Sequence, residues 1–259
     1  MGNKQRDYKI LAMKQLNINT LVLHRIVREK TVNFEDITED ILEKILQEGD
    51  GQLKTIEKAF LLDEDEKSIC LTFDDGYKSD VEIVLPKLLK IGGGATFFIV
   101  KDYLNNDGFM CDKDVLQLSN QGMQIGSHSM THPNFLQINN SKRMEELISS
   151  KKYLEDLTSR KVSTFSFPFG FINESLIEMV FEAGYEYCCT SQHGLSNKYS
   201  TIIPRNSING GQNISTILRS MNPTFLTRTY WYLEDSIKPH MKAMSPRLYK
   251  KMRNLISRY

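Results

Sequence analysis

The feature that most constrains the fold is an alternation of short apolar runs with longer stretches of helical periodicity, between residues 19 and 190. In the longer stretches apolar residues recur every three or four positions, which is typical of amphipathic helices. Strands that alternate with helices predict a parallel sheet covered by helices, either a doubly wound sheet or a (β/α) barrel. The predicted strands are 19–26, 68–73, 94–100, 123–128, 163–170 and 185–190, and the predicted helices are 37–49, 79–91, 112–122, 141–158 and 173–184.

Composition excludes several classes of protein. The 259 residues carry a net charge of +1 and no basic stripe interleaved with aromatic residues, so a nucleic-acid binder is disfavoured. No stretch approaches the roughly 18 consecutive apolar residues of a membrane-spanning helix. The start of the chain lacks the apolar core of a secretory signal. The four cysteines fit no zinc-ligand spacing. We therefore expect a reduced, cytoplasmic protein, although a secreted chain that had lost its signal would look the same.

Ionisable side chains gather where the predicted strands end. Asp74 and Asp75 follow the strand 68–73, and His24 follows the apolar run "LVL" near the start. His128 closes the strand 123–128, and His132 comes four residues later. The carboxyl ends of parallel strands meet at one edge of a sheet, where active sites of such folds are built. The sequence therefore predicts that these five side chains share one site.

The residue types at this edge indicate a metal. His128 and His132, with a nearby aspartate, provide two imidazoles and one carboxylate, a set that leaves positions open for water. Simpler interpretations stay open at this point. Asp-Gly between strands is a strong hairpin-turn signal, so Asp74 and Asp75 could lie in a surface turn. The histidines could be ordinary loop or core residues bonded to backbone.

Three motifs occur in a fixed order on this pattern: "TFDDG" at 72–76, "HSMTH" at 128–132 and "FPFG" at 167–170. In this respect the chain resembles the polysaccharide deacetylases of carbohydrate esterase family four, the NodB homology domain, over residues 15–210. The resemblance implies a distorted (β/α)7-8 barrel of the TIM type. It also implies that Asp75, His128 and His132 bind a divalent metal, zinc or alternatively cobalt, nickel or manganese. Asp74 would be the general base.

The chain departs from the family pattern at three motifs. Ser166 stands where the third motif usually has arginine, and the fourth motif, Asp-x-x-Asp-Trp, has no counterpart. The late histidine that serves as general acid is also missing. A permuted branch, which includes poly-N-acetylglucosamine deacetylases, carries that histidine near the N-terminus. His24 resembles that placement and is assigned as general acid, with a buried structural histidine as the alternative. Arg205 is a candidate replacement for the lost arginine near Asp74.

The resemblance implies metal-assisted hydrolysis that removes N-acetyl groups from an N-acetylated sugar, oligosaccharide, polysaccharide or lipid-linked glycan. The backbone N–H of Phe169, just after Pro168, is the candidate oxyanion donor, and Arg205 is grouped with these two as a substrate-side residue. One alternative is the removal of another acyl group, from a different amide or an O-acetyl ester. A second alternative, of another class, is an inactive pseudoenzyme that binds glycan, for which the missing motifs are the argument.

Three segments are expected along the chain: an extension at 1–12, the deacetylase domain at 13–235 and a basic tail at 236–259. The tail holds seven basic residues and no acidic one. Its apolar residues recur at helical spacing, which suits an interfacial helix on anionic lipid. A basic helix packed on the barrel is the other interpretation. Contact with a membrane would make a lipid-linked glycan a natural substrate.

Overall fold

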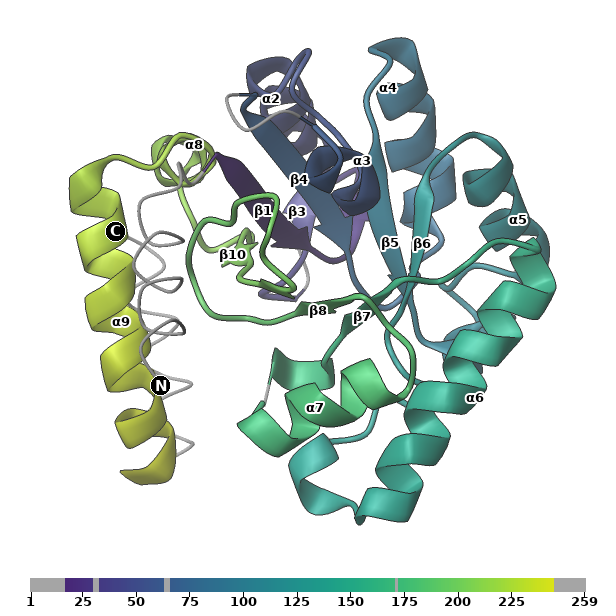
Figure 1. Cartoon of the computed structure of the whole chain (residues 1–259). Coiled ribbons are helices and arrows are strands. Elements are labelled where there is room, and N and C mark those ends of the chain that lie inside the picture. The colour runs from purple at the N-terminus through teal and green to yellow at the C-terminus, as the bar shows by residue number, and fades with distance from the viewer. Residues whose placement is uncertain (1–16, 30–32, 63–65, 171, 245–259) are drawn as a thin grey trace.

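The computed structural model describes residues 17–29, 33–62, 66–170 and 172–244, with side chains up to residue 236. Eight strands form one parallel sheet in the order β10-β1-β4-β5-β6-β7-β8-β9, and it curls into a partial barrel (Figure 1). The strands are β1 (Ile18–Leu23), β4 (Ser68–Phe73), β5 (Ala95–Ile99), β6 (Gln124–Ser127), β7 (Thr164–Ser166), β8 (Tyr187–Cys189), β9 (Ile202–Ile203) and β10 (Asn206–Ser207). A small second sheet pairs β2 (Ile26–Val27) with β3 (Ile37–Thr38).

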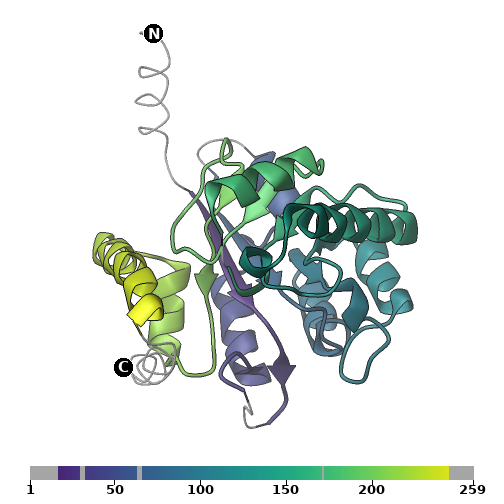
Figure 2. The same cartoon turned by 90° about the horizontal axis from the view of Figure 1, so that it is seen from below.

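Helices surround the sheet, and Figure 2 shows α8 and α9 on one side and α4 to α6 on the other. None of the described helices is long and apolar enough to cross a bilayer. The longer helices are α2 (Glu39–Glu48), α3 (Ile56–Phe60), α4 (Leu85–Lys90), α5 (Asp112–Asn120), α6 (Asn140–Thr158), α7 (Glu174–Glu182), α8 (Ile214–Met221) and α9 (Phe225–Met244). Short turns are the π-helix η1 (Asp80–Val84) and the 3-10 turns η2 (Lys101–Tyr103), η3 (Phe135–Gln137) and η4 (Pro168–Gly170).

The fold class predicted from the alternation is confirmed. Each predicted strand and helix is present, the strand 68–73 with the predicted bounds and the others with shifted ends. The run 19–26 ends earlier than predicted, at Leu23, and resumes as the short strand β2. The predicted helix 79–91 contains Pro86, which removes one backbone donor. A π-turn therefore precedes α4, and the proline falls in the first turn of that helix. Strands β9 and β10 were not predicted because two residues carry no periodicity.

Register places the ends of neighbouring strands side by side. Leu23 of β1 is paired with Phe73 of β4, so the residues that follow, His24 and Asp74, lie next to each other along the edge. The backbone N–H of Asp74 donates to the Leu23 carbonyl at 3.0 Å. The backbone N–H of His128 donates in the same way to the carbonyl of Ile99, at 2.9 Å. Strand register alone thus brings three predicted site residues to one edge.

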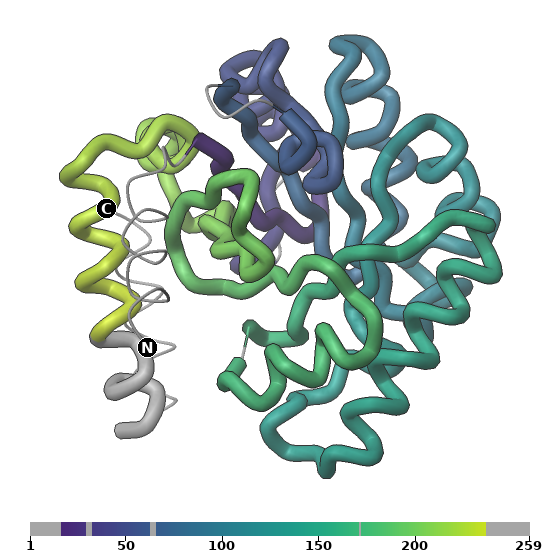
Figure 3. The backbone as a smooth tube through the Cα atoms, in the orientation of Figure 1, coloured from purple at the N-terminus to yellow at the C-terminus, as the bar shows by residue number. Residues whose placement is uncertain are grey.

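Strand pairing does not close the barrel between β9 and β10. Figure 3 lets the reader follow the chain to β10, which lies beside the purple β1 although about 185 residues separate them. Pro204 and Arg205 link β9 to β10 across the open side, and Arg205 is only 1% exposed. From this link the Arg205 side chain reaches the residues at the ends of β4 and β7, where it is buried.

The expected segment boundaries fall partly inside the described structure. The boundary between 235 and 236 lies within α9, which continues to Met244. The extension at 1–12 and the end of the basic tail, 245–259, lie outside the described residues.

Gly126 in β6 is predicted to be intolerant of alanine. An added Cβ would lie 2.5 Å from two ring carbons of Phe98 and 2.9 Å from the Thr164 hydroxyl. Overpacking of this kind costs about 1–3 kcal/mol, because the buried ring has no free space to enter. We expect Gly126→Ala to lower the free energy of unfolding in urea by that amount. Gly93→Ala, whose nearest contact is 3.3 Å, is the milder control. Equal midpoints for Gly126→Ala and wild type would contradict the prediction.

Candidate metal centre

The loop after β4 directs two adjacent carboxylates to different places. Asp75 has φ 77° and Gly76 has φ 79°, two successive left-handed residues. Such a φ is strained for aspartate and tends to persist at functional sites. The direction of the Asp75 side chain therefore comes from this left-handed turn. In an extended strand successive side chains point to opposite faces, which would by itself predict different directions for Asp74 and Asp75. That explanation is wrong for Asp75, because its backbone is left-handed and not extended. The alternative of a hairpin turn is also wrong, because β4 pairs in parallel with β1 and β5.

Asp75, His128 and His132 form a compact group of potential metal ligands. Their donor atoms all lie within 4.8 Å of one another. Asp75 Oδ1 is 3.4 Å from His132 Nε2 and 3.6 Å from His128 Nε2. Tetrahedral ligands about 2.1 Å from a zinc ion are about 3.4 Å apart. The three side chains thus have the spacing of a metal site, and they come from the loops after β4 and β6.

The surroundings of the two histidines suit them to metal binding. His128 Nδ1 lies 2.7 Å from the carbonyl oxygen of Ser166, so Nδ1 carries the proton and donates it. In the neutral ring Nε2 then carries the lone pair. In many metal sites a hydrogen bond from the other ring nitrogen orients a histidine ligand in this way. Burial and the neighbouring His128 lower the pKa of His132 to about 4, against the attraction of Asp75. The His132 imidazole is therefore unprotonated near neutral pH and offers a lone pair.

One unpartnered atom supports the presence of a cation at this group. Asp75 Oδ1 is buried and has no hydrogen-bond partner. Leaving a buried carboxylate oxygen unpaired costs free energy, which a bound cation would offset. A hard carboxylate and two imidazoles are ligands that suit zinc and similar divalent metals. The residues present therefore fit the divalent metal expected from the sequence.

Asp74 lies beside that group, with Oδ2 3.7 Å from His128 Nε2, and is held by Arg205. The guanidinium donates from Nη1 to Asp74 Oδ1 at 2.7 Å and from Nη2 to Oδ2 at 2.8 Å. Burial would raise the pKa of Asp74, but Arg205 and His128, with a smaller contribution from His24, outweigh it. The pKa of Asp74 is held well below its usual range, so its carboxylate is ionised throughout the neutral range.

Arg205 contacts only protein groups at its remaining donors. Nη2 donates to the Ser166 hydroxyl at 2.7 Å, Nη1 to the Thr72 hydroxyl at 3.1 Å and Nε to the Thr190 carbonyl at 3.2 Å. The small Ser166, noted as a departure from the family motif, leaves room for the guanidinium. Arg205 therefore lies behind Asp74 as a positioning residue. It does not lie on the open side, where the sequence grouped it with substrate-side residues.

His24 lies beside Asp74 at the end of β1. It is half-buried, and its Nδ1 atom is buried without a hydrogen-bond partner. His24 influences the pKa of both Asp74 and His132, which puts it within electrostatic range of both sides of the site. A structural histidine bonded to backbone would have satisfied Nδ1, so the geometry favours a functional imidazole over that alternative.

Phe169 lies at the rim of the site. Its ring centroid is 4.6 Å from that of His132, and the ring is 57% exposed. Its backbone is left-handed, with φ 60°, within the turn η4 that follows β7. Pro168 before it is buried and fixes the entry to that turn. The structure thus brings the candidate oxyanion residue to the same edge as the metal group.

The rings of Tyr77, Tyr103 and Phe109 form an aromatic wall next to His132, which the sequence did not predict. The Tyr103 ring lies 5.7 Å from His132 and 4.8 Å from Phe109, which stacks on Tyr77 at 5.0 Å. Aromatic side chains next to a few polar groups are typical of sites that bind small molecules. Only the loops after β4 and β5 bring these three residues together, so no sequence pattern could have found them.

Asp80 is a second residue that the sequence did not single out. It is fully buried at the start of the π-helix η1, and neither carboxyl oxygen has a hydrogen-bond partner. Burial, with the nearby charges of Asp75 and Asp74, raises the pKa of Asp80 well above its usual value. A π-helix interrupts regular helix most often at functional sites. Asp80 is therefore a buried carboxyl group without a hydrogen-bond partner, and burial near the two other carboxylates favours its protonated form.

Comparisons with known proteins agree with this geometry. Residues 62–188 match the family model described as Polysaccharide deacetylase, so this part of the chain is a domain of that family. A peptidoglycan-N-acetylglucosamine deacetylase of Bacillus cereus is 30% identical over 129 residues, which are 49% of this chain and 58% of that protein. The YxkH protein of Bacillus subtilis is 25% identical over 133 residues, 51% of this chain and 48% of that protein. This chain thus spans about half the length of these relatives.

Solved structures show the same fold. The deacetylase PplD of Streptococcus pyogenes, in complex with acetate, superposes with a TM-score of 0.71 at 19% identity, covering 80% of this chain and 98% of that one. IcaB from Ammonifex degensii superposes with a TM-score of 0.69 at 18% identity, covering 80% of this chain and 98% of that one. At these identities the likeness establishes the deacetylase-type barrel.

Proposed function

We propose that this chain is a metal-dependent hydrolase that removes N-acetyl groups from an N-acetylated glycan. The observation that carries the proposal is the pairing of the group Asp75, His128 and His132 with a separate carboxylate, Asp74, which is held by Arg205 and is ionised near neutral pH. Two adjacent carboxylates with different partners divide metal binding from proton transfer. Family membership and relatives named as peptidoglycan deacetylases support an amino-sugar amide as the substrate.

The roles of the side chains follow from their positions. Asp75, His128 and His132 would hold the metal. When bound, a divalent metal lowers the pKa of water and polarises a carbonyl, as it does in other hydrolases. Asp74 accepts the proton of the attacking water, and Arg205 fixes the carboxylate in one orientation. The Phe169 N–H stabilises charge on the amide oxygen, a contribution worth about 3 kcal/mol for such donors.

His24 supplies the proton that the leaving amine requires. The amine nitrogen of a cleaved amide is a very poor leaving group unless it is protonated, so an acid on the leaving-group side is needed. His24 is adjacent to Asp74 through the β1–β4 register. The products would be acetate and a free amino sugar.

Removal of a ligand is expected to abolish metal binding. Changes to groups that only support a ligand cost about 10–100-fold in affinity, so the loss of a direct ligand is expected to cost at least about 100-fold. Asp75→Ala would show this in zinc titration by calorimetry and in metal content after dialysis. Asp156→Ala, an exposed acid paired with Lys152, is the matched control and should bind zinc like wild type. Equal zinc affinity in both variants would contradict the assignment of Asp75.

Acetate release tests the proposed function directly. Wild type with added zinc is expected to release acetate from N-acetylglucosamine oligosaccharides, and Asp75→Ala is expected to release none above background. Folding of both proteins is checked by circular dichroism. If wild type loaded with zinc binds these oligosaccharides but releases no acetate, the chain is a glycan-binding pseudoenzyme. Release from O-acetylated glycans alone would identify an esterase instead.

The acid role of His24 is expected to depend on the leaving group. His24→Ala should slow amide hydrolysis by about 10²–10⁴-fold. An aryl acetate releases a phenolate that needs no proton, so its hydrolysis should slow far less. The measurement is kcat/KM for both substrates in wild type and variant. An equal loss on both substrates would contradict the acid role.

A further inference from the structure

The outer side of α9 carries the largest group of exposed apolar side chains in the described residues. Leu226, Tyr230 and Leu233 are 78%, 52% and 54% exposed, and Phe225 and Tyr232 flank them. The first three are spaced four and three residues apart, so they form one stripe along the helix. In Figures 1 and 2 this helix lies at the outside of the molecule, away from α4 to α6. Contiguous exposed patches of this kind mark interaction surfaces.

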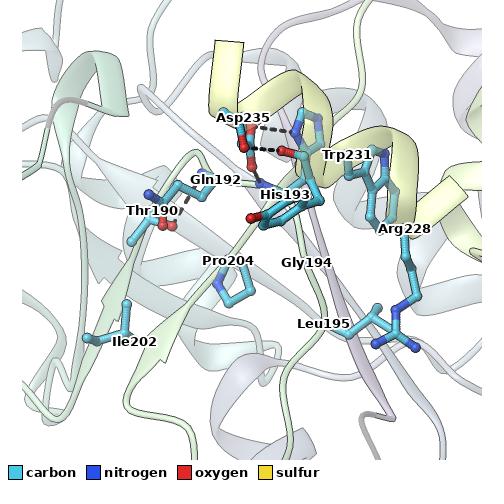
Figure 4. Close-up of a pocket in the computed structure, with 12 residues that line it drawn as sticks. Thr190, Gln192, His193, Gly194, Leu195, Ile202, Pro204, Arg228, Trp231 and Asp235 are labelled. Carbon is cyan, nitrogen blue, oxygen red and sulfur yellow. Dashed lines mark hydrogen bonds and ion pairs between the residues drawn. The ribbon is translucent and has the colours of Figure 1, made fainter. Parts of the chain in front are cut away.

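The inner side of α9 fixes which face points outward. Trp231 is 6% exposed, and its ring stacks on His193 with centroids 5.6 Å apart and planes 15° apart. Asp235 accepts from the His193 backbone N–H at 2.7 Å and lies 2.9 Å from its Nδ1 (Figure 4). These contacts line a pocket of about 550 Å³ between α9 and the loop after β8. Trp231 and Asp235 hold α9 against the loop after β8, and the apolar stripe lies on the opposite side of the helix, where its side chains are more than half exposed.

The sequence continues the same spacing beyond the stripe. The residues at the next positions of the repeat are Ile237, Met241 and Met244, within the bounds of α9. The segment 236–259 contains seven basic residues and no acidic one. An apolar and tyrosine-rich helix face joined to a basic segment is the composition of helices that lie in the interface of a membrane. Tyrosine is enriched at that depth because its ring is apolar and its hydroxyl is wet.

We propose that the outer face of α9 docks on the surface of an anionic lipid bilayer. Leu226, Tyr230 and Leu233 enter the boundary between headgroups and acyl chains, and the basic segment 236–259 attracts the negatively charged headgroups. Apolar burial and charge attraction together give a stable contact where either alone is weak. An anionic bilayer is favoured over a protein partner because the segment 236–259 has basic residues and no acidic ones. Such a segment is attracted to any uniformly negative surface and needs no specific pattern of charges on its partner. This proposal is independent of the hydrolase activity.

Vesicle binding tests the docking surface. Full-length wild type is expected to sediment with vesicles of phosphatidylcholine mixed with phosphatidylglycerol, and at least about tenfold more weakly with phosphatidylcholine alone. Added salt should release it, since charge attraction is screened. The combined variant Leu226→Ser, Tyr230→Ser and Leu233→Ser should lose at least about tenfold in vesicle affinity. The matched control removes three exposed apolar side chains from other faces: Leu61→Ser, Leu136→Ser and Ile148→Ser.

Specific outcomes would overturn the proposal. Wild type that stays in solution with anionic vesicles excludes a lipid surface as the occupant. Equal binding of the α9 variant and the control variant places the contact elsewhere. Light scattering of the lipid-free protein adds a third arm: a wild-type dimer that becomes monomeric in the α9 variant would identify a second copy of the chain as the occupant. Zinc binding is expected to be unchanged in both variants and reports that they are folded.

Discussion

Arg205→Met is expected to lower the free energy of unfolding by about 3–5 kcal/mol near neutral pH. The side chains of Asp74 and Arg205 are almost completely buried and meet in a two-point ion pair. Removing the guanidinium leaves Asp74 as an uncompensated buried carboxylate, which accounts for most of the loss. Ser166, Thr72 and the carbonyl of Thr190 also lose their donor. Urea unfolding of the metal-free proteins measures the difference.

The way in which this loss of stability changes with pH shows whether the unpaired Asp74 carboxylate causes it. The pKa of Asp74 is depressed in the folded protein, so its pairing stabilises above the unfolded pKa of about 3.9 and the stabilisation is lost as pH falls through the folded value. Without Arg205, burial raises the pKa of Asp74, and the carboxyl becomes neutral at a higher pH. The gap between wild type and variant should therefore shrink on acidification. A gap that is constant with pH would indicate lost packing instead.

The double variant Asp74→Leu with Arg205→Met separates the contribution of this ion pair to stability from its contribution to activity. Replacing both buried charges by apolar side chains is often neutral or stabilising, so much of the lost stability should return. The double variant should nevertheless have no activity. A cost for Arg205→Met of less than about 1 kcal/mol would contradict the assigned role of this pair.

Asp74→Asn is expected to slow acetate release by about 10²–10⁴-fold while leaving zinc affinity near that of wild type. Asparagine has nearly the same shape but cannot accept the proton of the attacking water. The metal group consists of other side chains, so it is retained. The measurements are kcat for acetate release and zinc titration by calorimetry, at a temperature where the variant is folded.

The choice of substrate distinguishes Asp74 from His24. Loss of the base should slow an amide and an aryl acetate alike, because both need an activated water. Loss of the acid in His24→Ala should spare the aryl acetate. Activity of Asp74→Asn within a few-fold of wild type would show that another group accepts the proton.

Much of the fold could be predicted because its signals are local. Apolar periodicity identifies the strands β1, β4, β5, β6, β7 and β8 and most of the helices between them, and right-handed parallel crossovers then leave few arrangements. Asp74 and His128 could be placed at one edge because each directly follows a strand, and Asp75 and His132 because they come one and four residues after them. The sequence does not predict the short strands β9 and β10 or the helix α3, because segments of two to five residues are too short to show a periodic pattern.

The contacts of individual side chains depend on residues far apart in sequence. Arg205 reaches Asp74 from 131 positions away, and only the passage of the chain across the open side of the barrel brings it there. The direction of Asp75 depends on a left-handed turn, which the sequence suggests through Gly76 but does not specify. The aromatic wall of Tyr77, Tyr103 and Phe109 likewise joins two separate loops.

The sequence by itself determined a helix-covered parallel sheet with a carboxylate pair and two histidines at its active edge. These features follow from periodicity and from the position of residues relative to strand ends, both of which are properties of short segments. Only the tertiary structure decided that Arg205 supports Asp74, that the small Ser166 makes room for it and that α9 turns its apolar stripe outward. Those features are pairings across the barrel, and packing of distant segments selects them.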